Sequence, residues 1–199
     1  MTSQRVPNRW GEGSRLRDEI LDGARTLIEE RGEQAVTLRA VARSVGIAAP
    51  SIYAHFPDRG AIVSALVDEA FDELAMLVTS ATDGETDPVA RLHAACAAYL
   101  KFAMLRPNRY GLAFAARQAN TVPRESATRA FTLLVDAIHD CVDAGASTSE
   151  DPFGDATAIW VALHGYADLH GSRPAFPWPD TDATLNRIVS ALAGLPGHP

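Results

Sequence analysis

The stretch TLRAVARSVGIAAPSIYAHF, residues 37–56, contains two short apolar-patterned segments separated by a glycine. The first is expected to be a helix over residues 38–45, capped by Thr37. Its core-facing residues are Leu38, Val41 and Val45. Ala42 is small enough for a second helix to cross closely, and Gly46, four positions later, tolerates the left-handed backbone of a tight turn. The stretch therefore predicts a helix-turn-helix.

The second segment, expected to be a helix over residues 49–55, leaves a distinctive face free. Its apolar anchors are Ile47, Ile52 and Phe56, and the outward residues are Ala48, Ala49, Pro50, Ser51, Tyr53 and His55. Small side chains let backbone N–H groups approach an anion, and hydroxyl groups can bond to phosphates or base edges. Thr37, Arg39 and Arg59 are suited to phosphates. The alternative is that the two helices simply pack in an ordinary bundle.

Charge is distributed unevenly along the chain of 199 residues, whose net formal charge is −7. Residues 1–60 contain nine arginines and eight acidic residues, whereas residues 61–199 contain nine basic and seventeen acidic residues. A polyanion would therefore meet the N-terminal third of the chain.

The N-terminal end adds further cations. Residues 1–13 are expected to form a flexible basic arm, whose Arg5, Arg9 and Trp10 could reach an adjacent minor groove. The alternative is a disordered tail without a role. The first amphipathic helix should follow, with Ser14 as its cap and Gly32 closing it.

The remaining pattern is helical throughout, which predicts an all-α fold of about nine helices. A long helix should begin just after Pro57, because the fixed backbone angle of proline suits a first helical turn. The acidic turn TDGETDP, residues 82–88, should connect an N-terminal helical domain over residues 14–80 to a second helical domain over residues 81–199. Further helices are expected at about residues 88–105, 107–118, 124–144, 153–170 and 181–194.

The N-terminal part resembles the TetR family of transcriptional regulators over about residues 14–80. The matching residues are Thr37, Val41, Ala42, Gly46, Ile47, Tyr53, His55, Phe56 and Arg59, with Ser44 or Val45 at the small-residue position before the glycine. The family often has Lys and Glu after the proline loop, where this chain has Arg59 and Gly60. Arginine keeps the charge, but Gly60 weakens the first turn of the next helix.

The resemblance implies a function and assigns roles to residues. Tyr53 and His55 would contact phosphates, Ala48 to Ser51 would contact bases, and Thr37, Arg39 and Arg59 would add phosphate contacts. The implied protein is a repressor that binds a palindromic double-stranded DNA operator as a homodimer and is released by a small molecule. The alternative is an activator or adaptor of the same fold without an inducer.

The C-terminal part has a second, less specific resemblance, to the WHG class of TetR C-terminal domains. It depends on Trp160, His164 and Gly165. A cavity for a small apolar or amphipathic effector could be lined by Phe102, Tyr110, Phe114, Trp160, His164 and Tyr166. The alternative places Trp160 and His164 in the core. The residues expected at a two-fold helical interface are Leu163, Leu185, Ile188, Val189 and Leu192.

Other functions receive little support from the sequence. The two cysteines, Cys96 and Cys141, lie in apolar patterns typical of reduced, buried thiols. No apolar run long enough to span a membrane and no secretory signal occurs, so the expected location is cytoplasmic and no membrane partner is expected. Two groups have spacings compatible with a metal, His93 with Cys96, and His164 with Asp168 and His170, but neither has further ligands in register.

An enzyme using His164, Asp168 and His170 as acid–base groups is a second alternative. The chain has no nucleophile elbow, phosphate loop, metal quartet or dinucleotide fingerprint. We therefore expect no catalytic activity, no metal and no cofactor.

Overall fold

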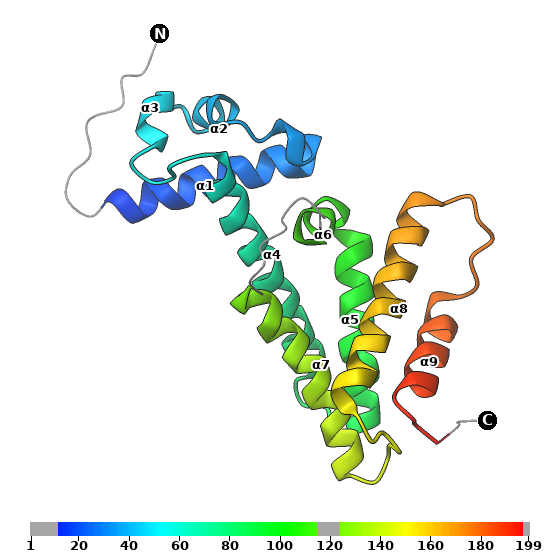
Figure 1. The fold of residues 1–199 in the computed structure, drawn as a ribbon. Helices are drawn as coiled ribbons and strands as arrows, with labels where there is room; N and C mark the ends of the chain where they lie inside the picture. The colour runs from blue at the N-terminus through cyan, green and yellow to red at the C-terminus, as the bar shows by residue number, and fades with distance from the viewer. Residues whose placement is uncertain (1–11, 115–123, 197–199) are drawn as a thin grey trace. The chain divides into compact units, whose positions relative to one another are not determined.

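The computed structural model describes residues 12–114 and 124–196, and within these ranges it contains nine α-helices, one short 3-10 helix and no strand (Figure 1). The all-α prediction is therefore confirmed. The elements are α1 Glu12–Arg31, η1 Glu33–Ala35, α2 Leu38–Val45, α3 Ala49–Ile52, α4 Arg59–Thr82, α5 Pro88–Leu105, α6 Pro107–Phe114, α7 Glu125–Asp143, α8 Pro152–Ser172 and α9 Thr181–Leu192. The predicted arm at residues 1–13, with Arg5, Arg9 and Trp10, lies almost wholly outside the described residues.

The chain forms two compact units, Met1–Val67 and Asp68–Pro199, called here the N-terminal and the C-terminal unit. The division falls inside α4, so one continuous helix contributes its first turns to one unit and its later turns to the other. The domain boundary that the sequence suggests at residues 80–81, where α4 ends, stays a prediction.

In the N-terminal unit, α1 packs closely against α2. A Cβ atom built on Gly23 would lie 2.6 Å from Ser44 Oγ and 2.7 Å from Val45 Cγ2, so any larger residue at this crossing would force these side chains or the helices to shift. The core of the unit consists of fully buried apolar side chains from all four helices, among them Ile20, Ile28, Val41, Ile52 and Ile62.

Several helix ends differ from the sequence-based expectation in this unit. Helix α1 begins at Glu12, so Ser14 lies within the helix and is not its cap. Helix α4 does begin just after Pro57, at Arg59, but the proline is not in its first turn, which is capped by Asp58, because its Oδ1 accepts a hydrogen bond of 2.8 Å from the Ala61 N–H. Helix α3 ends at Ile52, three residues before the predicted end, and turns follow it.

In the C-terminal unit, α5 lies at the centre and contacts α6, α7, α8 and α9. Three of these helices begin at aspartate caps: Asp87 accepts from the Val89 N–H, Asp151 from Gly154 and Asp180 from Ala183. Salt bridges fasten the later turns of α4 to α6, to α7 and to the residues just before each of them. These salt bridges are Arg109–Glu73, Arg106–Glu73, Arg124–Asp68 and Arg129–Asp72.

Candidate functional site

The turn between α2 and α3 has the geometry that the sequence predicts. Thr37 caps α2, since its hydroxyl oxygen accepts a hydrogen bond of 3.1 Å from the Ala40 N–H. Gly46 has φ 73° and ψ 31°, the left-handed conformation that ends α2. The Ile47 N–H then donates to the Ala42 carbonyl at 3.0 Å, which closes the turn. This backbone arrangement satisfies the last carbonyls of α2 and directs the chain into α3.

Helix α3 is held from one side only. Ile52 and Phe56 are buried, and the Phe56 N–H donates to the Ile52 carbonyl at 2.9 Å. On the other side, Tyr53 is 59% exposed. The other predicted contact residues on the surface are Thr37, Arg39, Ala48, Pro50 and Ser51, while Ala49 and His55 are half-buried. The predicted outward face is thus accessible in its main part, and its contact with DNA stays a prediction.

Arg59 has a different environment from the one predicted. Its Nε donates to the Val36 carbonyl at 2.7 Å, and its Nη2 donates to the Glu33 carbonyl at 3.0 Å and to Glu33 Oε1 at 2.9 Å. The guanidinium therefore fixes η1 and the segment before α2 to the first turn of α4. Because Nε and Nη2 are used inside the unit, we assign Arg59 a positioning role, while its predicted phosphate contact stays a prediction, since the side chain is 39% exposed.

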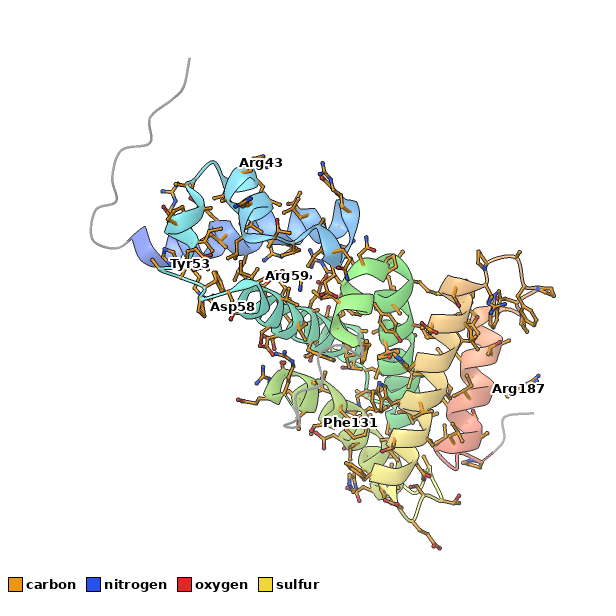
Figure 2. The ribbon with its side chains drawn as sticks, turned by 45° about the horizontal axis from the view of Figure 1, so that its top comes forward. Arg43, Tyr53, Asp58, Arg59, Phe131 and Arg187 are labelled. Atoms are coloured by element: carbon orange, nitrogen blue, oxygen red, sulfur yellow. The ribbon has the colours of Figure 1, made fainter. Side chains whose placement is uncertain are left out.

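Arg43 is a candidate that the sequence-based reasoning did not include. It is exposed in the last turn of α2, one helical turn after Arg39 and on the same face. Figure 2 shows Arg43 at the outer edge of the N-terminal unit, whereas Arg59 lies among its elements. The spacing of Arg39 and Arg43 in the sequence could have identified this pair.

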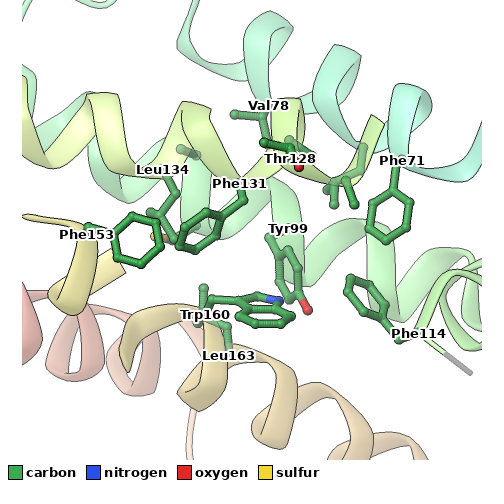
Figure 3. Close-up of a pocket in the computed structure, with 15 residues that line it drawn as sticks. Phe71, Val78, Tyr99, Phe114, Thr128, Phe131, Leu134, Phe153, Trp160 and Leu163 are labelled. Carbon is green, nitrogen blue, oxygen red and sulfur yellow. The ribbon is translucent and has the colours of Figure 1, made fainter. Parts of the chain in front are cut away.

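The C-terminal unit contains a cavity of about 460 Å³ (Figure 3). Its described wall comes from α4, α5, α6, α7 and α8. The lining residues are Phe71, Leu74, Val78, Ala95, Cys96, Tyr99, Phe114, Ala127, Thr128, Ala130, Phe131, Leu134, Phe153, Trp160 and Leu163. The volume and the apolar wall are typical of small-molecule sites.

Two of the six predicted cavity residues, Phe114 and Trp160, belong to this wall. Phe102 is buried in the core and does not line the cavity. Tyr166 is also outside the wall, because its hydroxyl bonds to Thr181 and its ring packs against Trp178.

Tyr110 and His164 lie just behind the wall, and hydrogen bonds connect them to Tyr99, which belongs to the wall. The Tyr110 hydroxyl lies 2.6 Å from His164 Nδ1, and the Tyr99 hydroxyl lies 3.1 Å from the Tyr110 hydroxyl and 3.3 Å from the same nitrogen. Burial raises the pKa of Tyr110 to about 12, although the bond to Tyr99 lowers it and the nearby Asp168 raises it. Both the predicted His164 and the unpredicted Tyr99 thus belong to one polar cluster.

The sequence-based reasoning missed the α4 and α7 sides of the cavity. Phe71, Leu74 and Val78 follow one stripe of α4, and Ala127, Phe131 and Leu134 follow one stripe of α7. The helical spacing in each stripe was a usable signal for a buried face. It could not distinguish a cavity wall from an ordinary core.

Three of the residues predicted for a dimer interface are buried within the single chain. Leu163 lines the cavity, and Leu185 and Val189 belong to the core beside α5 and α8. A side chain covered by its own chain has no surface to offer a partner, so these three assignments are wrong. Ile188 and Leu192 are half-buried.

Neither a metal site nor a membrane span is found in the described part of the chain. Residues 12–114 and 124–196 contain no group of three or more His, Cys, Asp or Glu side chains that could hold a metal ion. Within the same ranges, no helix has the length and apolar character needed to cross a membrane. Cys96 and Cys141 are free and buried, as predicted.

Two family models match the chain. The model described as bacterial regulatory proteins, tetR family, matches residues 20–66. The model described as tetracyclin repressor-like, C-terminal domain, matches residues 92–192, which is about half of the chain. The chain belongs to the TetR family. The assignment of its C-terminal region to the WHG class stays a prediction.

Individual relatives of the chain are transcriptional regulators. The chain is 24% identical over 199 residues to the HTH-type transcriptional regulator Rv1816 of Mycobacterium tuberculosis, covering 97% of this chain and 82% of the relative. It is 31% identical over 87 residues to the HTH-type transcriptional repressor KstR2 of Mycolicibacterium smegmatis, covering 44% and 42% of the two chains.

A solved structure of similar fold matches nearly the whole chain. A protein of unknown function from Rhodococcus sp. RHA1 superposes with a TM-score of 0.81 at 24% identity, covering 95% of this chain and 99% of the other. The matched family and the named relatives are transcriptional regulators. This TetR-family chain is therefore a DNA-binding transcriptional regulator and not an enzyme.

Proposed function

We propose that this TetR-family protein is a ligand-responsive repressor that binds a palindromic operator as a homodimer. The observation that carries the proposal is that helix α4 belongs to both functional parts of the chain. Its first residue, Arg59, holds the segment before α2, and its later residues Phe71, Leu74 and Val78 line the apolar cavity. A ligand that displaces these side chains would act on the helix that supports the DNA-contact unit.

Contact with DNA would use the exposed side of the helix-turn-helix. Arg39 and Arg43 would bind phosphates as cations, and Tyr53 would donate its hydroxyl to a phosphate oxygen. His55 and Thr37 would contribute further backbone contacts. The small residues Ala48 to Ser51 would let the backbone approach the base edges, and sequence preference would depend partly on the shape of the duplex.

Dimerisation would supply a second recognition helix, which would bind the second half-site of the operator, because one short recognition helix contacts too little DNA for specificity. In place of the buried Leu163, helix α8 presents Val161 and Leu169, which are 60% and 51% exposed. Gly165 lies between them at helical spacing, and a Cβ atom there would meet nothing within 4 Å. We propose that this α8 face, with Ile188 and Leu192 of α9, packs against its two-fold copy.

Effector binding and DNA binding would be coupled. If the ligand favours a dimer state that fits consecutive major grooves less well, thermodynamic linkage requires DNA to weaken the ligand by the same factor. Repression, as opposed to activation, is supported by the similarity to KstR2, which is a transcriptional repressor.

Selection of bound duplexes from a random pool tests the DNA-binding part of the proposal. The expected result is a motif with two inverted half-sites about one helical turn apart. An asymmetric single half-site would contradict the dimer, and Leu169→Glu should then have no effect on binding. For a homodimer, Leu169→Glu should yield monomers by light scattering and abolish tight binding to the palindrome.

A reporter gene behind the selected operator separates repression from activation. If the protein is a repressor, deletion of the gene that encodes it should raise expression of the reporter gene. A fall in expression would instead support the activator alternative.

A further inference from the structure

The chemistry of the cavity wall restricts the class of ligand more narrowly than the volume of the cavity does. This inference rests on the proposed effector-binding role of the cavity. Among the described lining residues none carries a formal charge. The Cys96 thiol is also neutral at pH 7, because burial, followed by the nearby Cys141, raises its pKa to about 12. An ionised ligand group would lose its hydration here without gaining a partner of opposite charge.

Aromatic rings form a large part of the same wall. They are Phe71, Tyr99, Phe114, Phe131, Phe153 and Trp160. The rings already meet one another at distances suited to edge contacts: the Phe71 and Phe114 centroids are 5.3 Å apart, and those of Phe131 and Phe153 are 5.4 Å apart. Flat, rigid ring systems can stack against such faces with little loss of conformational freedom.

Tyr99 is the polar group of this wall that has a hydrogen-bond network behind it. Figure 3 shows its hydroxyl between the side chains of Trp160 and Phe114. The Thr128 hydroxyl, by contrast, donates to the Arg124 carbonyl of its own helix at 3.0 Å.

The network leaves one hydrogen-bonding function of Tyr99 unused in either tautomer of His164. If Nδ1 is an acceptor, the Tyr110 hydroxyl donates to it and the Tyr99 hydroxyl donates to Tyr110. The Tyr99 oxygen, which also accepts from the Trp160 side chain, keeps a second lone pair that can accept. If Nδ1 carries the proton, the direction reverses and the Tyr99 hydroxyl is left to donate. Tyr99 can therefore pair with a ligand hydroxyl or with a ligand carbonyl.

We propose that the cavity selects an uncharged, flat ring compound with a single hydroxyl or carbonyl group, which forms a hydrogen bond with Tyr99. The aromatic wall binds the apolar body of the ligand. Tyr99 fixes its orientation, and Tyr110 with His164 holds the Tyr99 hydroxyl in place. Anionic compounds of the same shape are excluded because the described wall offers no cation.

Three probes of nearly equal shape test this proposal: phenanthrene, 9-phenanthrol and phenanthrene-9-carboxylate. Their binding to the full chain would be measured by titration calorimetry at pH 7. We expect 9-phenanthrol to bind at least as tightly as phenanthrene, and the carboxylate to bind about 100-fold more weakly or not at all. Carboxylate binding equal to or tighter than that of the phenol would overturn the proposal.

The Tyr99→Phe variant separates a ligand contact from a merely structural role. It should weaken 9-phenanthrol about 5-fold to 10-fold and change phenanthrene less than about 2-fold, because only the phenol loses a hydrogen bond. Tyr166→Phe is the matched control, since its hydroxyl bonds to Thr181 outside the cavity. An equal loss for both probes in Tyr99→Phe would contradict the assigned contact.

The same probes distinguish this inference from the proposed function. If 9-phenanthrol binds with the expected Tyr99 dependence but does not release the selected operator duplex, the ligand class stands and ligand-responsive repression fails. If the carboxylate binds best and releases the operator, repression stands and the ligand class fails. Binding of none of the three probes would overturn the ligand class.

Discussion

At the scale of single residues, arginines of the N-terminal unit serve different purposes. Arg39 and Arg43 are exposed on α2, whereas the Arg59 guanidinium donates to two backbone carbonyls and one carboxylate within the unit. A planar guanidinium can satisfy three such acceptors at once, which a lysine ammonium cannot do in the same geometry. The exposed pair and Arg59 should therefore respond differently to substitution.

Replacement of Arg59 by lysine should destabilise the N-terminal unit. The hydrogen bonds to Val36 and Glu33 would be lost or weakened, and we expect the free energy of unfolding to fall by about 1–2 kcal/mol. Urea denaturation measures this, with Arg39→Lys as an exposed control that should change stability by less than about 0.5 kcal/mol. Unchanged stability in Arg59→Lys, together with weaker DNA binding, would instead restore a phosphate contact for Arg59.

Replacement of Arg43 by alanine should weaken DNA binding without affecting the fold. Removal of one phosphate contact should lower affinity for all duplexes similarly and reduce the slope of log affinity against log salt concentration by about 1. Fluorescence anisotropy at several salt concentrations measures both effects. Lys101→Ala removes the same charge from an exposed position on α5 and should leave the slope unchanged. An unaltered slope in Arg43→Ala would exclude the contact.

At the scale of elements, the helix-turn-helix is predictable from local rules, but its packing is not. The bounds of α2, the Thr37 cap and the left-handed Gly46 follow from capping and turn preferences within ten residues. Helix α3 is shorter than its sequence pattern suggests, because the chain bends after Ile52 to bury Phe56. The close α1–α2 crossing at Gly23 joins residues about twenty positions apart and has no local signature.

Gly23→Ala should destabilise the N-terminal unit although alanine favours helices. Its added methyl group would overlap Ser44 Oγ at 2.6 Å and Val45 Cγ2 at 2.7 Å, so these side chains or the two helices would have to shift. We expect a loss of about 1–3 kcal/mol in the free energy of unfolding.

Gly111→Ala on α6 provides the comparison for this substitution. A Cβ atom there would meet nothing within 4 Å, so it should raise stability by up to about 1 kcal/mol. Equal effects of the two substitutions in urea denaturation would show that the crossing at Gly23 can relax.

At the scale of the whole molecule, buried thiol and phenol groups should make the stability of the fold decrease at alkaline pH. Burial raises the pKa of Cys96 from 9.0 to about 12 and that of Tyr110 from 10.0 to about 12. The unfolded chain releases the Cys96 proton above about pH 9 and the Tyr110 proton above about pH 10, while the folded chain retains both. Stability is therefore fully present below pH 9 and falls as pH rises toward 12, by about 1.4 kcal/mol per pH unit for the Cys96 proton and by less for the Tyr110 proton, which solvent screens in part.

Urea denaturation between pH 8 and pH 11 checks this dependence. The Cys96→Ala variant should lose less stability over that interval than the parent, even if its stability at pH 8 is lower. Parallel curves for the two proteins would contradict a raised Cys96 pKa in the folded state.

The sequence by itself determined the all-helical fold, the helix-turn-helix and the membership of the TetR family, because capping, turn and helical-period signals all act within short distances along the chain. Only the tertiary structure decided that Arg59 is held internally, that Leu163 lines a cavity and that Tyr99 connects this cavity to Tyr110 and His164. The physical reason is that each of these environments is created by side chains from helices distant in sequence. An apolar residue at helical spacing looks the same whether it fills a core, lines a cavity or meets a partner.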